Sequence, residues 1–168
     1  MNLQKSKWNA ADEVEFTINL ALMPKPWFEW HQMQYRLPES SKPRVHDGLW
    51  WDRLSPNHEL SMDGEFWRII DRATAETCAA DAVDRLDRVG IPRLLELLDR
   101  DSLMRAIRVG DFGFDKGSPS MPLAILLSDS GPGPELEEAI AKLEPELVGW
   151  KLKDQFVSWV RDRADRHR

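Results

Sequence analysis

The chain has 168 residues, 42% hydrophobic and 31% charged, with a formal net charge of −6 at pH 7. This length suits one domain, residues 1–168, with a continuous core. The acidic balance argues against a nucleic-acid partner, because proteins that bind nucleic acid usually carry a basic face. The single cysteine, Cys78, excludes an intrachain disulfide and a cysteine-based zinc cluster, which favours a reducing cytoplasm. No apolar run approaches the ~20 residues that cross a bilayer, so no membrane partner is expected.

Residues 1–71 have the patterns of strands. In EFTINLAL, residues 15–22, apolar and polar side chains alternate with the two-residue period of a strand that has one buried face. We predict that this strand pairs antiparallel with MNLQKSK, residues 1–7. The tryptophan-rich stretches 46–55 and 64–71 are also strand-like.

After residue 72 the apolar residues fall three and four apart, which is typical of helices. The first stripe consists of Ala75, Cys78, Ala79, Ala82, Val83, Leu86 and Val89. Gly90 is expected to end this helix and Pro92 to begin the next. We therefore predict an α+β fold, with a small antiparallel sheet in residues 1–71 packed against helices in residues 73–164. Trp67, Leu86 and Leu95 are predicted to lie in the core.

Three short elements carry a resemblance to a known family: Gln4 with Ser6, Phe16 to Leu20, and Gly90 to Pro92. Over about residues 2–108 the chain resembles an uncharacterised bacterial family, the domain of unknown function 4304. The resemblance implies a fold but no established activity. It also implies that this chain lacks the one or two strands, and often a helix, that such proteins carry before the first strand found here, either as a shortened gene model or as a natural variant.

An uncovered first strand would present unpaired backbone groups to other chains. We expect its edge to be covered by the Trp27–Trp30 segment or by the C-terminal helix, or to be paired with a second molecule in a homodimer. Lys5 and Lys7 would give part of the protection.

The first candidate binding surface is the polar face of this hairpin. Alternation places Gln4, Ser6, Thr17 and Asn19 on one side of the sheet. These groups could bind a peptide, a sugar or a base. They could equally form a solvated sheet face, or make buried hydrogen bonds within the protein.

Tryptophan supplies the second candidate, with eight in the chain. Trp27 and Trp30 stand in PKPWFEW, a proline-bounded segment that we expect to be a loop rather than a helix. These two side chains are expected either to be buried in the core or to anchor a binding partner. Trp50 and Trp51 must point to opposite faces of a strand, so burying both requires a sheet covered on both sides.

The third candidate is His46-Asp47, where a titrating group, a carboxylate and Trp51 adjoin. It is a polar cluster at the mouth of an aromatic-walled pocket, or only a loop histidine and a strand-entry aspartate. Further carboxylates that could form a hydrolase site with Lys5 or Lys7 are Asp52, Asp63 and Glu65. The histidines lack metal-binding spacing and no standard catalytic motif is present, so we expect no metal and no cofactor.

Two functional hypotheses follow. The first is a non-enzymatic cytoplasmic binding module for a protein partner, for example a basic toxin held in the manner of an immunity protein. The second is a small enzyme or ligand-binding protein that uses the His46/Asp47 and tryptophan pocket. An exposed patch without a deep cavity would favour the first, and a concave pocket lined by His46 or a carboxylate would favour the second.

Overall fold

The computed structural model describes residues 1–6, 12–38, 40–56, 65–113 and 118–167. Within these ranges an antiparallel sheet contains β1 (Asn2–Lys5), β2 (Val14–Leu22), β3 (Trp50–Leu54) and β4 (Trp67–Ile69). The central strand is β2, which pairs with β1 along one side and with β3 and β4 along the other. The predicted pairing of the first segment with the second strand is confirmed, and so is the α+β class.

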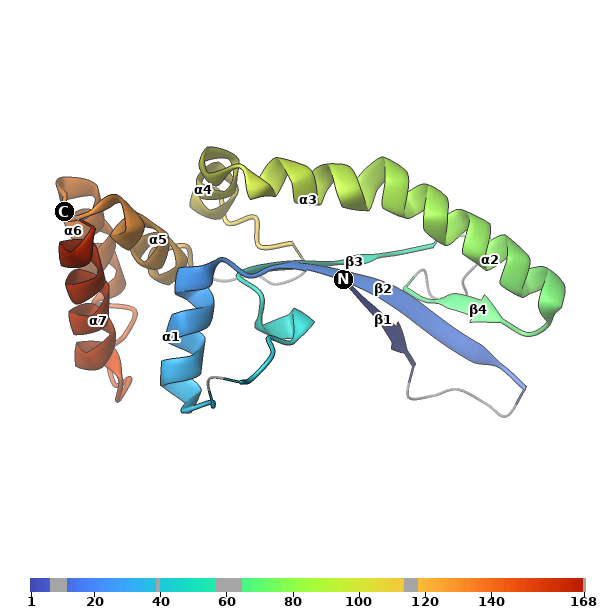
Figure 1. Ribbon diagram of the computed structural model, residues 1–168, viewed down its shortest axis with the longest axis horizontal. Helices are drawn as coiled ribbons and strands as arrows, with labels where there is room; N and C mark the ends of the chain where they lie inside the picture. Colours follow the sequence, from blue (N-terminus) through green and yellow to red (C-terminus); the bar gives the residue numbers. More distant parts are fainter. Residues whose placement is uncertain (7–11, 39, 57–64, 114–117, 168) are drawn as a thin grey trace.

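Seven α-helices lie in the described part of the chain, most of them after the sheet. They are α1 (Lys25–Tyr35), α2 (Arg72–Arg85), α3 (Ile91–Leu98), α4 (Arg100–Arg108), α5 (Ser120–Leu127), α6 (Pro134–Leu143) and α7 (Lys153–Arg166). In Figure 1, α2 and α3 run end to end over one face of the sheet, and α5 to α7 gather beside α1 at one end of the molecule.

One face of the sheet is apolar and lies under α2 and α3. Phe16, Ile18 and Leu20 of β2 are buried on it, and Phe16 stacks on Trp67 with 5.3 Å between ring centroids. Trp67 is fully buried, as predicted. Its indole N–H donates to Asp81 of α2 at 2.8 Å, which fastens the helix to β4.

The prediction that Gly90 ends a helix was wrong. A π-helical turn, Leu86–Gly90 (η3), joins α2 to α3 without a break. A Cβ atom at Gly90 would lie 2.8 Å from Leu20 Cδ1 and 3.0 Å from Leu54 Cδ1. Glycine at this position therefore serves the close approach of the helix to β2 and β3 rather than a change of chain direction.

The segment around Trp27 and Trp30 is also not the loop that its prolines predicted, because it forms α1. Pro24 is the N-cap and Pro26 lies in the first turn, where a missing N–H removes no helical hydrogen bond. This helix carries Trp30 against Trp150, Phe156 and Trp159, with 4.8 to 6.0 Å between ring centroids.

Both tryptophans of β3 are buried, with Trp50 2% and Trp51 6% exposed. Trp50 belongs to the core on the helix face. Trp51 points to the other face, where His46 of the 3₁₀ turn Val45–Asp47 (η1) packs on it edge to face. The backbone of Gly113 lies along the edge of β3, where it forms a parallel bridge with Trp51, and the Trp51 N–H donates to the Phe112 carbonyl oxygen at 3.2 Å. The sheet is thus covered on both sides near β3.

The edge strand β1 lacks the cover that we expected from the Trp27–Trp30 segment or the C-terminal helix. Trp30 of α1 packs on α7, and in Figure 1 both helices lie at one end of the molecule, away from β1. Asn2, Leu3 and Lys5 are exposed, Leu3 by 61%. Within the described residues, β1 pairs with β2 only.

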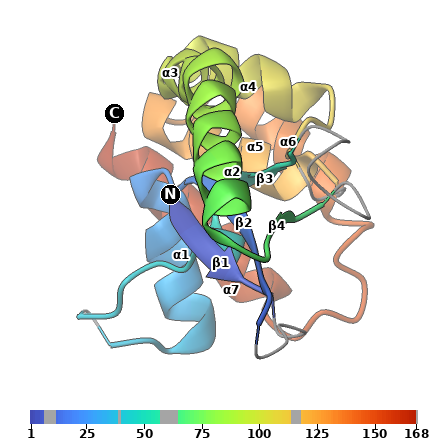
Figure 2. The same cartoon turned by 90° about the vertical axis from the view of Figure 1, so that its right-hand side faces the viewer.

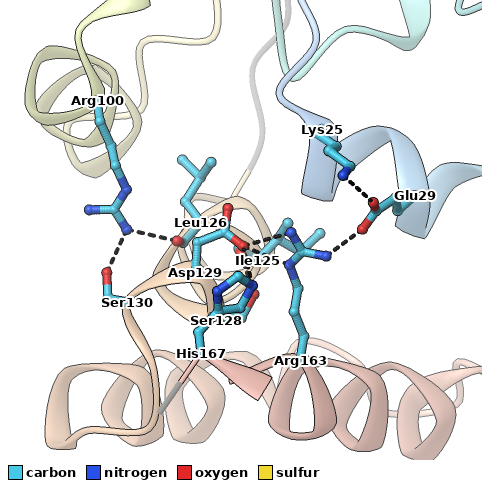
Figure 3. A network of polar contacts seen from close by, with 10 residues as sticks. All are labelled: Lys25, Glu29, Arg100, Ile125, Leu126, Ser128, Asp129, Ser130, Arg163 and His167. Atoms are coloured by element: carbon cyan, nitrogen blue, oxygen red, sulfur yellow. Dashed lines mark hydrogen bonds and ion pairs between the residues drawn. The ribbon is translucent and has the colours of Figure 1, made fainter. Parts of the chain in front are cut away.

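A buried arginine joins α1 to the C-terminal helices (Figure 3). Arg163 of α7 has a side chain only 10% exposed and forms ion pairs with Glu29 of α1 and with Asp129, the latter at 2.7 Å. Its guanidinium carbon also lies 5.7 Å from the centroid of the Trp159 ring. Paired in this way, the buried charge ties the far ends of the chain together.

Candidate functional site

Asp47, predicted as part of a pocket, closes the η1 turn. Arg44 donates to its carboxylate from Nε at 2.8 Å and from Nη2 at 2.9 Å. These hydrogen bonds lower the pKa of Asp47, against the opposing effect of burial. The Trp27 indole N–H donates to the Asp47 carbonyl oxygen at 2.9 Å, so the structure brings together these two predicted residues.

The histidine beside this carboxylate is His31 of α1 rather than His46. His31 Nε2 lies 3.6 Å from Asp47 Oδ2, and the two side chains are 14% and 12% exposed. With Tyr35, Leu37 and Arg44 they line a depression of about 370 Å³. His46 is exposed and turned onto Trp51, with 4.8 Å between ring centroids. Sequence reasoning missed His31 because the spacing between α1 and η1 gives no signal of contact.

The predicted polar sheet face is an internal hydrogen-bond network. Thr17 and Asn19 are fully buried. The Asn19 amide donates to Gln4 Oε1 at 2.7 Å, and the Thr17 hydroxyl donates to the Leu54 carbonyl oxygen at 3.2 Å. The Ser6 N–H donates to the Glu15 carbonyl oxygen at 2.9 Å. Of the interpretations left open, this arrangement favours buried hydrogen bonds within the protein, because a ligand cannot reach Thr17 or Asn19.

The predicted carboxylates do not converge. Asp52 lies on the helix face of β3, where burial raises its pKa and the neighbouring Asp111 adds to that effect. Glu65 pairs with Arg53 at 3.0 Å, and Asp47 lies in η1. Asp63 and Lys7 are outside the described residues. Among the residues that are described, no cluster of His, Cys, Asp and Glu is suited to hold a metal ion.

An exposed line of aliphatic side chains on α2 and α3 was not predicted as a site. Its members, which we call the α2–α3 stripe, are Val83 (58% exposed), Ile91 (44%), Leu95 (61%) and Leu98 (66%). The prediction of Leu95 in the core was wrong, and Leu86 is only partly buried against the core. The first predicted stripe is also split, since Cys78 and Ala82 are buried whereas Val83 and Val89 are about half exposed.

Two contacts between these helices and the sheet show which way the stripe faces. Asp81 binds Trp67 of β4, and Arg93 pairs with Asp111, which accepts from the Trp50 indole of β3 at 3.4 Å. Val83 is two residues from Asp81, and Ile91 and Leu95 are each two residues from Arg93. Two residues are about 200° around a helix, so the stripe lies on the side of the helical segment that is turned away from β3 and β4. Figure 2 shows this segment running over the sheet.

The π turn keeps the stripe continuous. An α-helix advances about 100° per residue, so Val83 and Ile91 would be about 80° out of line in an unbroken α-helix. The wider turn from Leu86 to Gly90 removes most of this offset. Three of the exposed carboxylates on this helical segment form ion pairs with arginines beside them, Glu76 with Arg72, Asp84 with Arg88 and Glu96 with Arg93. The stripe is therefore an apolar line bordered by paired charges.

A model of the family described as Domain of unknown function (DUF4304) matches residues 1–94, which include the sheet, α1, α2 and the first turn of α3. No curated protein and no solved structure matches the chain. No helix in the described part of the chain is long and apolar enough to span a membrane.

Proposed function

The chain belongs to the DUF4304 family, and we propose that it is a non-enzymatic module that binds a basic protein partner on the α2–α3 stripe. The observation that carries the proposal is the stripe itself. Four aliphatic side chains stand 44% to 66% exposed along one line of a continuous helical segment. Contiguous apolar surface of this kind, bordered by polar groups, is typical of protein interaction sites.

The shape of the stripe and the charge of the chain indicate what kind of partner would bind. A line of aliphatic residues at helical spacing suits the apolar face of an amphipathic helix, which packs by inserting its side chains between those of the stripe. The net charge of −6 favours a basic partner. Sequestration of a basic toxin, as by a bacterial immunity protein, is one role that fits. The single buried cysteine supports a cytoplasmic location.

Affinity capture from the native host tests this proposal. The tagged parent protein is compared with Leu95→Glu, which places a charge in the stripe, and with Val148→Glu. Val148 is 81% exposed and lies outside α2 and α3, so it is a matched control for an added surface carboxylate. We expect the parent and the control to retain the same basic protein, released by raised salt, and Leu95→Glu to lose it. Equal capture by all three variants would contradict the proposal.

The depression beside Asp47 supports a second candidate, binding of a small ligand. The His31 and Tyr35 rings lie 4.6 Å apart beside Arg44, so an aromatic surface and a cation meet there. The ion pair with Arg44 and the lowered pKa make Asp47 a fixed anion rather than a proton acceptor near neutral pH. A screen of small aromatic cations by thermal shift, repeated on His31→Ala, tests this candidate. A shift shared by both proteins would count against the depression as the site.

A further inference from the structure

The depression beside Asp47, the second candidate above, combines a carboxylate with two aromatic rings. The Asp47 side chain is only 12% exposed. Beside it the His31 and Tyr35 rings lie with 4.6 Å between their centroids and 54° between their planes. Aromatic faces attract cations, and guanidinium groups in particular stack on them. With a volume of about 370 Å³, the depression is large enough for a small organic cation.

Asp47 is held in place by contacts that do not depend on a ligand. The Trp27 indole N–H donates to the Asp47 carbonyl oxygen at 2.9 Å. On the inner side, His31 Nε2 lies 3.6 Å from Asp47 Oδ2, and the His31 side chain is 14% exposed. The carboxylate is therefore positioned before a ligand arrives, which lowers the cost of binding.

The outer partner of this carboxylate is the chain's own Arg44. Its guanidinium forms two parallel hydrogen bonds, from Nε to Asp47 Oδ2 at 2.8 Å and from Nη2 to Asp47 Oδ1 at 2.9 Å. This is the two-bond geometry in which carboxylates receive planar, fork-shaped cations. The Arg44 side chain is 79% exposed, so water would solvate it after it left. Ion pairs with such an exposed member contribute little to stability, and Arg44 can be displaced at small cost.

We propose that the depression binds a guanidinium or amidinium group from outside the chain, and that Arg44 is an internal occupant which such a ligand displaces. The two-bond pair carries this inference, because it shows that both Asp47 oxygens are turned toward a planar cation on the solvent side. An ammonium group cannot form the same pair of parallel bonds. The inference rests on the second candidate function and names its ligand class; it does not depend on the α2–α3 stripe.

Calorimetric titration of the full chain with benzamidine, up to about 10 mM, tests the inference. Benzamidine joins an amidinium group to an aromatic ring that can lie against Tyr35. We expect Arg44→Ala to bind it about two- to fivefold more tightly than the parent, because the internal competitor is gone. Arg105→Ala, which removes an exposed arginine of α4, is the matched control and should bind like the parent. Benzylamine, with the same ring but an ammonium group, should bind Arg44→Ala more weakly.

Two further variants show whether the cation is bound in the depression. Adding Asp47→Asn to Arg44→Ala should abolish benzamidine binding, with the fold checked by circular dichroism. Adding Tyr35→Ala instead, a change at a position 58% exposed, should weaken binding without disturbing the fold. N-acetylarginine amide distinguishes two sources of the cation. Its binding would assign the site to an arginine side chain of a peptide, whereas binding of benzamidine alone would assign it to a free small molecule.

Two results would overturn the inference. If benzamidine binds neither the parent nor Arg44→Ala, the depression is not a site for planar cations. If both proteins bind it equally and His31→Ala abolishes the binding, the depression is a cation site but Arg44 is not its occupant, and the second candidate function survives. In either case the proposed partner site stays intact, since the Leu95→Glu test concerns another surface.

Discussion

The exposure of Leu95 leads to a sharp prediction when it is compared with Leu97, two positions along the same helix. Leu97 is 1% exposed and Leu95 is 61% exposed. Truncating a fully buried leucine to alanine costs about 2–5 kcal/mol, because transfer free energy is lost and a cavity remains. Full burial of a leucine contributes roughly 1.5–3 kcal/mol, so the partial burial of Leu95 is worth less than about 1 kcal/mol. Alanine also matches leucine in helix propensity.

Guanidinium denaturation of Leu95→Ala and Leu97→Ala, followed by tryptophan fluorescence, measures both free energies of unfolding. We expect a loss of about 2–5 kcal/mol for Leu97→Ala and below about 1 kcal/mol for Leu95→Ala, with unchanged m-values. A Leu95→Ala variant as unstable as Leu97→Ala would show that Leu95 is a core residue. In that case the α2–α3 stripe would not be a free surface.

Three further predictions concern charged and titrating groups. Arg163→Met should cost about 2–3 kcal/mol in thermal unfolding, because it removes the buried guanidinium between Glu29 and Asp129 and leaves them only the longer contacts with Lys25 at 3.7 Å and His167 at 3.6 Å, whereas the exposed Arg161→Met should cost below about 0.5 kcal/mol. The folded-state pKa of Asp47 is lowered, so its stabilising contribution is full above the unfolded pKa of about 3.9 and is lost as pH falls through the folded value. As the pH is lowered, the free energy of unfolding of Asp47→Asn should therefore fall less than that of the parent. Burial raises the pKa of the Cys78 thiol, so an aromatic disulfide should react with it only on unfolding; fast reaction in native buffer would contradict its burial.

Much of the fold followed from local periodicity. The alternation in residues 15–22 specified a strand, and Phe16, Ile18 and Leu20 lie on its buried face. Gly90 shows the limit of such signals. A glycine near the end of an apolar stripe usually ends a helix, but here it makes room for Leu20 and Leu54, which are distant in the sequence.

The candidate sites were less predictable because they depend on contacts between elements. The Asp47 carboxylate was singled out, but its partners His31 and Arg44 depend on how α1 packs beside η1. The pattern of α2 and α3 offered more apolar residues than one sheet face can bury, and it did not distinguish Leu95 from Leu97. The excess itself was the available signal, since it requires a second apolar surface on the helix.

Site-specific photo-crosslinking in the native host tests the central claim most directly. A benzophenone amino acid is placed at Leu95, at Ile91 and, as a control, at Val148, three exposed positions that tolerate a large side chain. If the α2–α3 stripe binds a partner, Leu95 and Ile91 should crosslink to the same basic protein, and Val148 should not. The same weak background pattern at all three positions would contradict the claim.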